Sequence, residues 1–238
     1  MPLDLLAITA HRDDAELLCG GTLLMAKKQG YSTGIVDLSL GEMGTRGSAA
    51  LRGMEADRAA RILGLSVREN LELPDAGIVN TPETRLTLVR MIKKLQPNVI
   101  IAPAPRGKHP DHSASARLIR DASFVSGLAK LDPASPPFRP RKIIHAITYR
   151  EDHVKPTFVV DISEVFEQKM AAIKCYSSQF DDAIAGGEVY PNGESLYDIV
   201  RHQAAHYGSL IRVKYGEPFW TSETMSVVDV LGLGVSTF

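Results

Sequence analysis

The stretch LDLLAITAHRDDAELL, residues 3–18, contains an apolar run, a polar turn and the start of an amphipathic segment. The apolar run at 3–9 predicts a buried strand, and the segment at 16–29 predicts a helix. Four ionisable residues, HRDD at 11–14, separate the two. A strand, a short polar turn and a helix in this order are typical of a parallel α/β sheet.

The same alternation continues along the chain. Strands are predicted at 32–40, 70–73, 98–103, 142–148 and 157–162, and helices at 50–63, 82–96, 164–176 and 194–213. The run Val99-Ile100-Ile101 is continuously apolar, as in a strand that helices cover on both faces. We therefore predict a Rossmann-like α/β fold of three layers, with a mostly parallel sheet and helices on both faces. The proline-rich loop at 133–140 marks no boundary, so residues 1–238 are expected to form a single domain.

Composition narrows the class of protein. The chain has 238 residues, 44% of them hydrophobic, and a net charge of -1. A chain of this size can bury a full hydrophobic core without disulfides or structural metals. A bound metal would therefore be expected to take part in a reaction. The absence of a basic stripe argues against a nucleic acid partner. Cys19 and Cys175 form no paired motif, and no signal-like or membrane-spanning segment is evident. We expect a cytoplasmic protein that does not bind membranes.

Topology predicts where function lies, because open α/β sheets bind ligands beyond the carboxyl ends of their strands. Polar segments follow four predicted strands, at 11–14, 41–47, 74–75 and 106–112. A nucleotide site is disfavoured, since Gly20-Gly21 does not form a phosphate-binding glycine motif. Ionisable side chains are therefore expected to gather at one edge of the sheet.

Two histidine and aspartate clusters suggest a metal site. His11 with Asp14, and His109 with His112, are pairs about one helical turn apart, each at a strand exit. Catalytic zinc takes three nitrogen or oxygen ligands and leaves a position for water. Taken singly, the first pair equally suits a helix N-terminus and the second a surface loop. Their joint placement at neighbouring strand ends favours the metal.

These residues carry a resemblance. Residues 10–16 and 109–112 resemble the LmbE-like, or PIG-L-type, superfamily of zinc-dependent sugar N-deacetylases, over nearly the full chain. Residues 41–47, 69–75 and 207–211 resemble its bacillithiol biosynthesis branch, whose members deacetylate the malate glycoside of N-acetylglucosamine. The resemblance implies an amidohydrolase that removes the N-acetyl group from an N-acetylglucosamine derivative, and the malate glycoside is the expected substrate.

Roles follow from the resemblance by motif. The metal ligands fall on His11, Asp14 and His112, the general base on Asp13, and the histidine that stabilises the oxyanion or acts as acid on His109. Amide hydrolysis needs an activated water, a stabilised oxyanion and a protonated leaving amine, which these groups supply. One ion per chain is expected, zinc in the first place, although iron(II) or another divalent ion suits the same ligands.

Two neighbours of these motifs have more than one expected role. Asp111 is expected either to fix the tautomer of a histidine or to be a simple turn residue. Arg12 stands where the family usually has proline, which removes a backbone restraint and adds a cation beside two carboxylates. We expect this change to affect the rigidity of the loop more than activity. The alternative is that Arg12 points away into solvent, as most arginines do.

Substrate contacts follow from less specific features. The resemblance implies Arg52 and Asp75 as a sugar-binding pair. Arg46 and Arg106 are further candidates, since arginine binds carboxylates such as those of malate in a bidentate fashion. Tyr190 lies in a glycine-containing stretch that is expected to act as a lid, with a packing role as the alternative.

Other functions stay open at this point. They are a deacetylase of another amino sugar or of a chitooligosaccharide, a metal phosphoesterase, and a catalytically silent binding protein. The resemblance also implies a homo-oligomer, with a hexamer among the expected assemblies.

Overall fold

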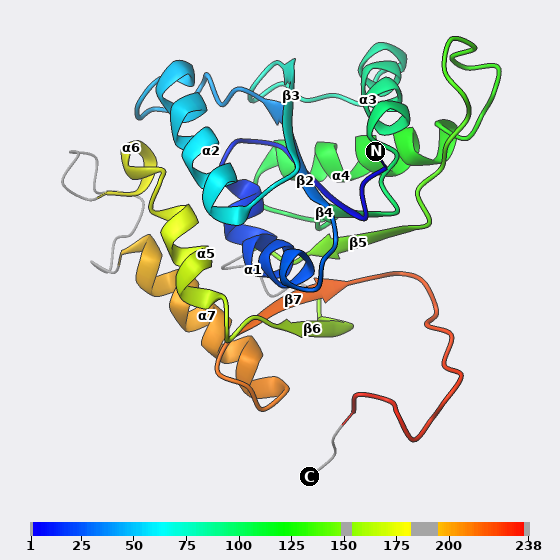
Figure 1. Ribbon diagram of the computed structural model, residues 1–238. Coiled ribbons are helices and arrows are strands. Elements are labelled where there is room, and N and C mark those ends of the chain that lie inside the picture. Colours follow the sequence, from blue (N-terminus) through cyan, green and yellow to red (C-terminus); the bar gives the residue numbers. More distant parts are fainter. Residues whose placement is uncertain (1, 149–153, 182–194, 236–238) are drawn as a thin grey trace.

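The computed structural model describes residues 2–148, 154–181 and 195–235, and its described strands form one seven-stranded sheet (Figure 1). The strands are β1 Leu5–Thr9, β2 Thr33–Ser39, β3 Val67–Leu73, β4 Val99–Pro103, β5 Lys142–Ala146, β6 Phe158–Asp161 and β7 Gly216–Trp220. The helices are α1 Asp14–Lys28, α2 Ala49–Leu63, α3 Pro82–Leu95, α4 Pro110–Val125, α5 Phe166–Ile173, α6 Ser177–Phe180 and α7 Leu196–Leu210.

The strand order is β3-β2-β1-β4-β5-β7-β6. The first five of these run parallel, whereas β7 is antiparallel to both β5 and β6. The predicted α/β class with a mostly parallel sheet is confirmed. Because β1 pairs with β2 on one side and β4 on the other, the order reverses between β1 and β4. This is the topological switch point at which such sheets bind ligands.

Helices cover both faces of the sheet (Figure 1). Alternate residues of β1 point to opposite faces, so Ala7 joins the core beneath α1, α2 and α5, while Leu6 and Ile8 join the core beneath α3 and α4. All three side chains are fully buried. The predicted three layers follow from this arrangement, while the extent of the domain over 1–238 stays a prediction.

Local sequence explains where several helices begin and end. The Ser48 hydroxyl caps α2 by accepting from the amide of Leu51, and Gly64 ends the same helix in the left-handed conformation, at φ 64°. Thr81 and Thr84 cap the start of α3 reciprocally, with proline at the first helical position. The predicted bounds of both helices agree with the structure to within one residue.

Two elements differ from the prediction. No helix is predicted at 110–125, yet α4 spans Pro110–Val125. No strand is predicted at 216–220, where β7 lies, and both Glu217 and Pro218 are unfavourable in a strand. Glu217 is tolerated there because it is buried against Lys169, whose ammonium lies 2.6 Å from it.

The Lys169–Glu217 pair also supports a break in α1. The backbone of Cys19 leaves the helical region, at φ -147°. Beyond the break, the Glu217 carboxylate accepts from the backbone amides of Gly21 and Thr22, at 2.8 and 2.7 Å. Before it, Lys169 donates to the carbonyl of Leu17, at 2.9 Å. The freed backbone groups are thus satisfied, as buried polar groups require. The break thus separates the first turn of α1, which carries Asp14, from the rest of the helix.

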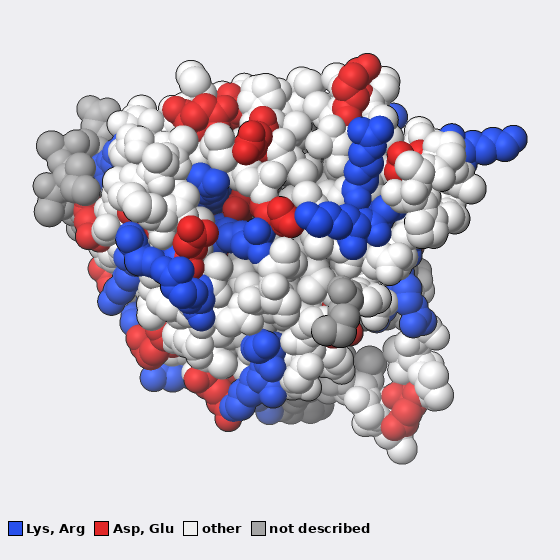
Figure 2. Space-filling model, turned by 45° about the horizontal axis from the view of Figure 1, so that its top comes forward, with Lys and Arg blue, Asp and Glu red and all other residues white. Residues whose placement is uncertain are grey.

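The face of the molecule in Figure 2 carries charges of both signs. Lys and Arg side chains are interspersed there with Asp and Glu, in keeping with the net charge of -1. None of the helices in the described ranges has both the length and the apolar character needed to cross a membrane.

Candidate active site

The two histidine clusters meet at the switch point of the sheet. His11 follows β1, and His109 and His112 lie at the start of α4, after the neighbouring strand β4. The ring centroid of His11 lies 4.8 Å from that of His109 and 5.5 Å from that of His112, and the last two rings are 5.0 Å apart. Residues a hundred positions apart in sequence therefore form one cluster.

The Asp14 carboxylate lies between two imidazoles. Its Oδ2 is 3.3 Å from Nδ1 of His11 and 3.2 Å from Nε2 of His112. Ligands held about 2.1 Å from a tetrahedral ion lie roughly 3.4 Å apart, so these separations suit one bound cation. The ring nitrogens of His11, His109 and His112 also lie within 4.8 Å of one another, as do ligand atoms of His11, Asp75 and Asp111.

Protonation reflects the same contacts. Burial raises the pKa of Asp14, but the charges and hydrogen bonds of His112 and His11 outweigh it and hold that pKa well below its usual value. Burial lowers the pKa of His11, but the hydrogen bond and charge of Asp14 raise it to about 9. The pKa of His112 is raised by Asp14 in the same way, against its burial. These contacts favour the ionised form of Asp14 and the protonated forms of His11 and His112.

Helix capping does not account for the two aspartates. Asp13 occupies the N-cap position of α1, yet its side chain makes no capping hydrogen bond there. Asp14 accepts from the amide of His11, at 2.9 Å, which is not an amide of the helix. Asp13 has a φ of 103°, a conformation that costs free energy for any residue with a side chain. Such strain is maintained only when the surroundings over-determine it.

Arg52, on α2, fixes the Asp13 side chain. Its Nη2 donates to Oδ2 of Asp13, at 2.7 Å, and to the carbonyl of Arg12, at 3.0 Å, while Nη1 donates to the carbonyl of Gly41, at 3.1 Å. Both side chains of the pair are buried. Burial raises the pKa of Asp13 to about 6, although Arg52 lowers it. The Arg52 guanidinium is thus directed to the Asp13 carboxylate. Its expected sugar-binding role stays a prediction.

Two carboxylates face the other side of His11. Its Nε2 lies 3.1 Å from Oδ1 of Asp75 and 3.3 Å from Oδ2 of Asp111. Their side chains are only 7% and 3% exposed. Asp75 also accepts from the amide of Met43, and Asp111 from that of Ala76, both at 2.8 Å. Carboxylates placed in this way keep the proton on Nε2 and leave Nδ1 free for a cation.

His109 has a different environment from its two neighbours. As the N-cap of α4, its Nδ1 accepts from the amide of Asp111, at 3.3 Å, so the proton of the neutral ring lies on Nε2. Burial and the nearby charges of His11 and His112 lower its pKa. The ring is exposed at the edge of the site. The lowered pKa favours the neutral ring, whose Nε2–H is a hydrogen-bond donor beside the cluster.

The remaining predicted residues lie farther from the cluster. The Arg46 guanidinium donates to the carbonyl of Gln179, at 3.1 Å, and the Gln179 amide donates back to the carbonyl of Arg46, at 2.8 Å. Arg106 is exposed after β4. Arg12 turns toward α2 and donates to the carbonyl of Ala49, at 2.9 Å. Tyr190 lies outside the described residues.

A buried network beneath the site escaped the sequence analysis. Arg68 on β3 donates to Glu16, at 2.6 Å, and to Asp37 on β2, at 2.8 Å. Tyr176 donates to the same oxygen of Glu16, at 3.0 Å. The available signal was Asp37 inside a predicted strand, since a buried charge needs a partner. Arg68 lies on β3, which begins at Val67, three residues before the predicted strand at 70–73. The network holds the first turn of α1, two residues beyond Asp14.

Comparisons with known proteins agree with this geometry. The family model PIG-L, described as GlcNAc-PI de-N-acetylase, matches residues 6–123. Diacetylchitobiose deacetylase of Thermococcus kodakarensis is 30% identical over 231 residues, which cover 89% of this chain and 80% of that protein. A probable N-acetyl-alpha-D-glucosaminyl L-malate deacetylase 2 of Bacillus anthracis is 28% identical, over 74% of this chain and 80% of that one.

A solved structure extends the likeness to the whole fold. The crystal structure of a conserved protein from Thermus thermophilus superposes with a TM-score of 0.85 at 39% identity, covering 95% of this chain and 97% of that one. Sequence, fold and the position of the histidine clusters thus point the same way. The chain belongs to the PIG-L family of metal-dependent deacetylases, hydrolases that act on N-acetyl amides.

Proposed function

We propose that this chain removes the acetyl group from an N-acetylglucosamine derivative with one divalent ion, zinc in the first place, held by His11, Asp14 and His112. The observation that carries the proposal is the Asp14 carboxylate, shared by two imidazoles at 3.3 and 3.2 Å, beside the buried Asp13. Two nitrogens and one oxygen are a donor set that suits zinc, and equally iron(II).

Asp13 is the proposed general base. When bound, the ion supplies Lewis acidity toward the acetyl carbonyl and lowers the pKa of water. Asp13 then takes the proton of the attacking water and passes it to the departing sugar nitrogen. Arg52 holds one carboxylate oxygen in place, at 2.7 Å, and a pKa of about 6 leaves Asp13 ionised near neutral pH.

His109 is the proposed donor to the oxyanion. Its Nδ1 accepts a backbone amide, so the ring is oriented with the Nε2 proton available to the acetyl oxygen. A positioned donor of this kind stabilises the negative charge that develops in the transition state. The role requires no net charge on the ring, in keeping with a lowered pKa.

For the substrate we propose the malate glycoside of N-acetylglucosamine, as in bacillithiol biosynthesis. The Bacillus anthracis relative supports it, and the exposed Arg106 offers a cation for a carboxylate at the end of β4. Diacetylchitobiose is the competing substrate, because the Thermococcus kodakarensis relative matches more of this chain. Arg106→Ala should raise KM for the malate glycoside and leave KM for diacetylchitobiose unchanged. An equal effect on both would refute the malate proposal.

The activity itself is tested by metal analysis together with acetate release from a panel of N-acetylglucosamine derivatives. We expect about one zinc per chain and acetate from at least one member of the panel. Asp13→Asn should abolish turnover and retain the ion. Loss of the ion in that variant would reassign Asp13 as a ligand. Hydrolysis of a phosphate ester without acetate release would favour a phosphoesterase, and neither activity a silent binding protein.

We propose a cytoplasmic location as well. Cys19 and Cys175 are both free thiols, which suits a reducing compartment. Fractionation of the native host followed by immunodetection tests this, and recovery of the chain outside the cytoplasmic fraction would contradict it.

A further inference from the structure

The chain beyond β7 is an extended apolar arm. We call residues 221–235 the C-terminal arm. It carries seven large apolar side chains whose exposed fractions run from 44% for Val227 to 101% for Val228. They are Met225, Val227, Val228, Val230, Leu231, Leu233 and Val235.

The arm takes its shape from its own backbone. Asp229 accepts from the amide of Leu231, at 3.0 Å, and Val230 from that of Leu233, at 3.3 Å. Its hydrogen bond to the rest of the described chain lies at its root, where the amide of Thr221 donates to the Thr157 hydroxyl, at 3.1 Å. Figure 1 shows the arm, in red, running away from the sheet and its helices. The body of the same chain therefore does not cover its apolar side chains.

A contiguous apolar segment of this kind marks an interaction site, whereas scattered exposed hydrophobic residues need no explanation. The arm is also acidic. Glu223 and Asp229 lie within it, and no lysine or arginine follows Lys214 in the sequence. Negative charge disfavours anionic lipid surfaces and nucleic acids. The partner surface should therefore be apolar with a cationic edge.

The same chain has such a surface at the end of α4, which we call the α4 patch: Phe124, Leu128 and Leu131. These side chains are 61%, 46% and 42% exposed. Beside them is a depression of about 450 Å³ lined by Arg85, Arg120, Asp121, Phe124 and Val125. A further cation lies over the ring of Phe124, since the guanidinium carbon of Arg139 is 4.5 Å from its centroid. The patch thus combines an apolar floor with three arginines, one of which, Arg120, is paired with Asp121 at 2.9 Å.

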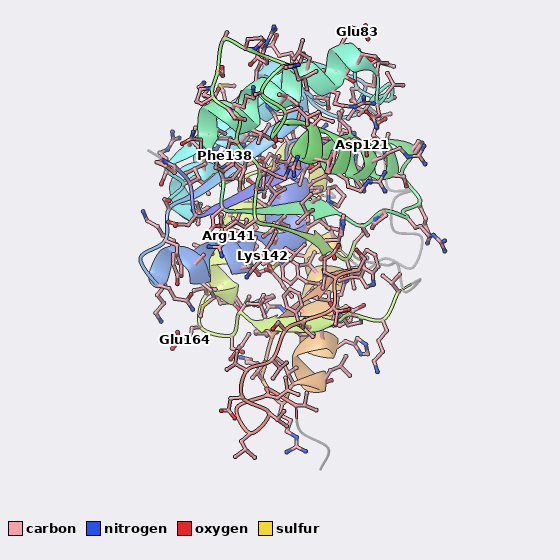
Figure 3. The ribbon with its side chains drawn as sticks, turned by 90° about the vertical axis from the view of Figure 1, so that its right-hand side faces the viewer. Glu83, Asp121, Phe138, Arg141, Lys142 and Glu164 are labelled. Atoms are coloured by element: carbon pink, nitrogen blue, oxygen red, sulfur yellow. The ribbon has the colours of Figure 1, made fainter. Side chains whose placement is uncertain are left out.

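The arm and the α4 patch lie at different ends of the molecule. In Figure 3, α4 with its labelled Asp121 lies in the upper half, whereas the arm hangs below the sheet, and Figure 1 shows the same separation. We infer that the C-terminal arm docks on the α4 patch of a second copy of this chain. The occupant is a second copy because apolar surface and charge on the two elements are complementary, and each copy supplies both. This gives a physical basis, independent of the proposed function, for the expected homo-oligomer.

The test measures the assembly state of the full chain by sedimentation velocity over a concentration series. The arm variant is Val228→Asp with Leu231→Asp, and the patch variant is Phe124→Asp. Both place charge on side chains that are exposed in the single chain, so folding should be retained, as circular dichroism can verify. The control is Tyr31→Asp, at a side chain that is 51% exposed on neither surface.

We expect the wild type and the control to sediment as oligomers, and the arm and patch variants each to raise the dissociation constant at least tenfold. As a second measurement, chains with Val228→Cys mixed with chains with Leu128→Cys should form a disulfide-linked pair. A wild type that is monomeric throughout the series would overturn the inference. Dissociation by the arm variant without dissociation by the patch variant, or no cross-linked pair, would equally overturn it.

Discussion

The contact of Asp75 with His11 gives the sharpest prediction about the site. The resemblance to sugar deacetylases implies that Asp75 binds the sugar, whereas the structure places its Oδ1 3.1 Å from Nε2 of His11, a proposed metal ligand. We predict that Asp75→Ala weakens zinc binding. The carboxylate keeps the proton on Nε2 and so favours the tautomer whose Nδ1 binds a cation.

The expected magnitude follows from the number of acceptors. Loss of a partner behind a metal-binding histidine costs about 10- to 100-fold in affinity. Two carboxylates share the Nε2 proton here, at 3.1 and 3.3 Å, so Asp111 remains when Asp75 is removed. Asp75→Ala should therefore raise the zinc dissociation constant about tenfold, or about 1.4 kcal/mol. The double variant with Asp111→Ala should reach about 100-fold. Asp75→Asn keeps a hydrogen-bond acceptor and should have a smaller effect than Asp75→Ala.

Chelator competition measures the zinc dissociation constant, and KM is measured separately at saturating zinc. The two roles of Asp75 separate cleanly in these readouts. A positioning role raises the dissociation constant and changes KM little. Zinc affinity equal to that of the wild type, with a raised KM in both Asp75→Ala and Asp75→Asn, would refute the reasoning and restore the sugar-binding role.

Three further predictions concern stability, protons and backbone strain. Glu217→Gln leaves the Lys169 ammonium without its buried charge partner and should cost about 3 kcal/mol of unfolding free energy in urea denaturation. The raised pKa of His11, about 9, means that its protonation stabilises the metal-free protein fully below about pH 6.5, and that this contribution is lost as pH rises through about 9. Zinc binding at pH 7 should accordingly release protons, which calorimetry in two buffers of different ionisation enthalpy detects. Gly41→Ala adds a Cβ at φ 73° that would overlap the Arg52 guanidinium, which holds Asp13, the proposed general base, and should lower kcat as well as stability.

Two of these have a matched control. Lys28→Ala removes the exposed pair with Glu164 and should cost less than about 1 kcal/mol, so an equal loss in both variants would contradict the account of the buried pair. Gly64→Ala introduces similar backbone strain, at φ 64°, without a close contact, and should affect stability alone. Unchanged kcat in Gly41→Ala, or no proton release on zinc binding, would contradict the other two.

Local patterns predict most of the fold, because most of its elements have local causes. The apolar runs at β1 and β4 and the glycine after α2 lie where hydrophobicity and backbone freedom alone place them. β7 fails this rule, since its Glu217 is tolerated only through Lys169, a residue 48 positions away. The start of α4 fails it for another reason. Its first turn carries the polar residues Asp111 and His112, so the sequence there resembles that of a loop.

In the candidate site, too, some features follow from local patterns and others depend on tertiary contacts. His11 and His112 approach each other because β1 and β4 are neighbours, in keeping with the predicted placement of the two clusters at neighbouring strand ends. The partners of Asp13 and of His11 depend on the paths of two loops and on one helix. The bond of the Arg52 guanidinium to Asp13 is not predicted, and the expected contact of Arg52 with the sugar stays a prediction. Geometry of this kind is set by tertiary packing and has no signature in residue spacing.

Acetate release from metal-stripped and reconstituted protein tests the central claim most directly. The chain is stripped with a chelator, zinc is returned stepwise, and acetate is measured with N-acetylglucosamine derivatives that include the malate glycoside and diacetylchitobiose. We predict no acetate from the stripped chain and release that rises with zinc to saturation near one ion per chain. Zinc bound at that stoichiometry without acetate from any derivative, or acetate release that does not depend on the ion, would contradict it.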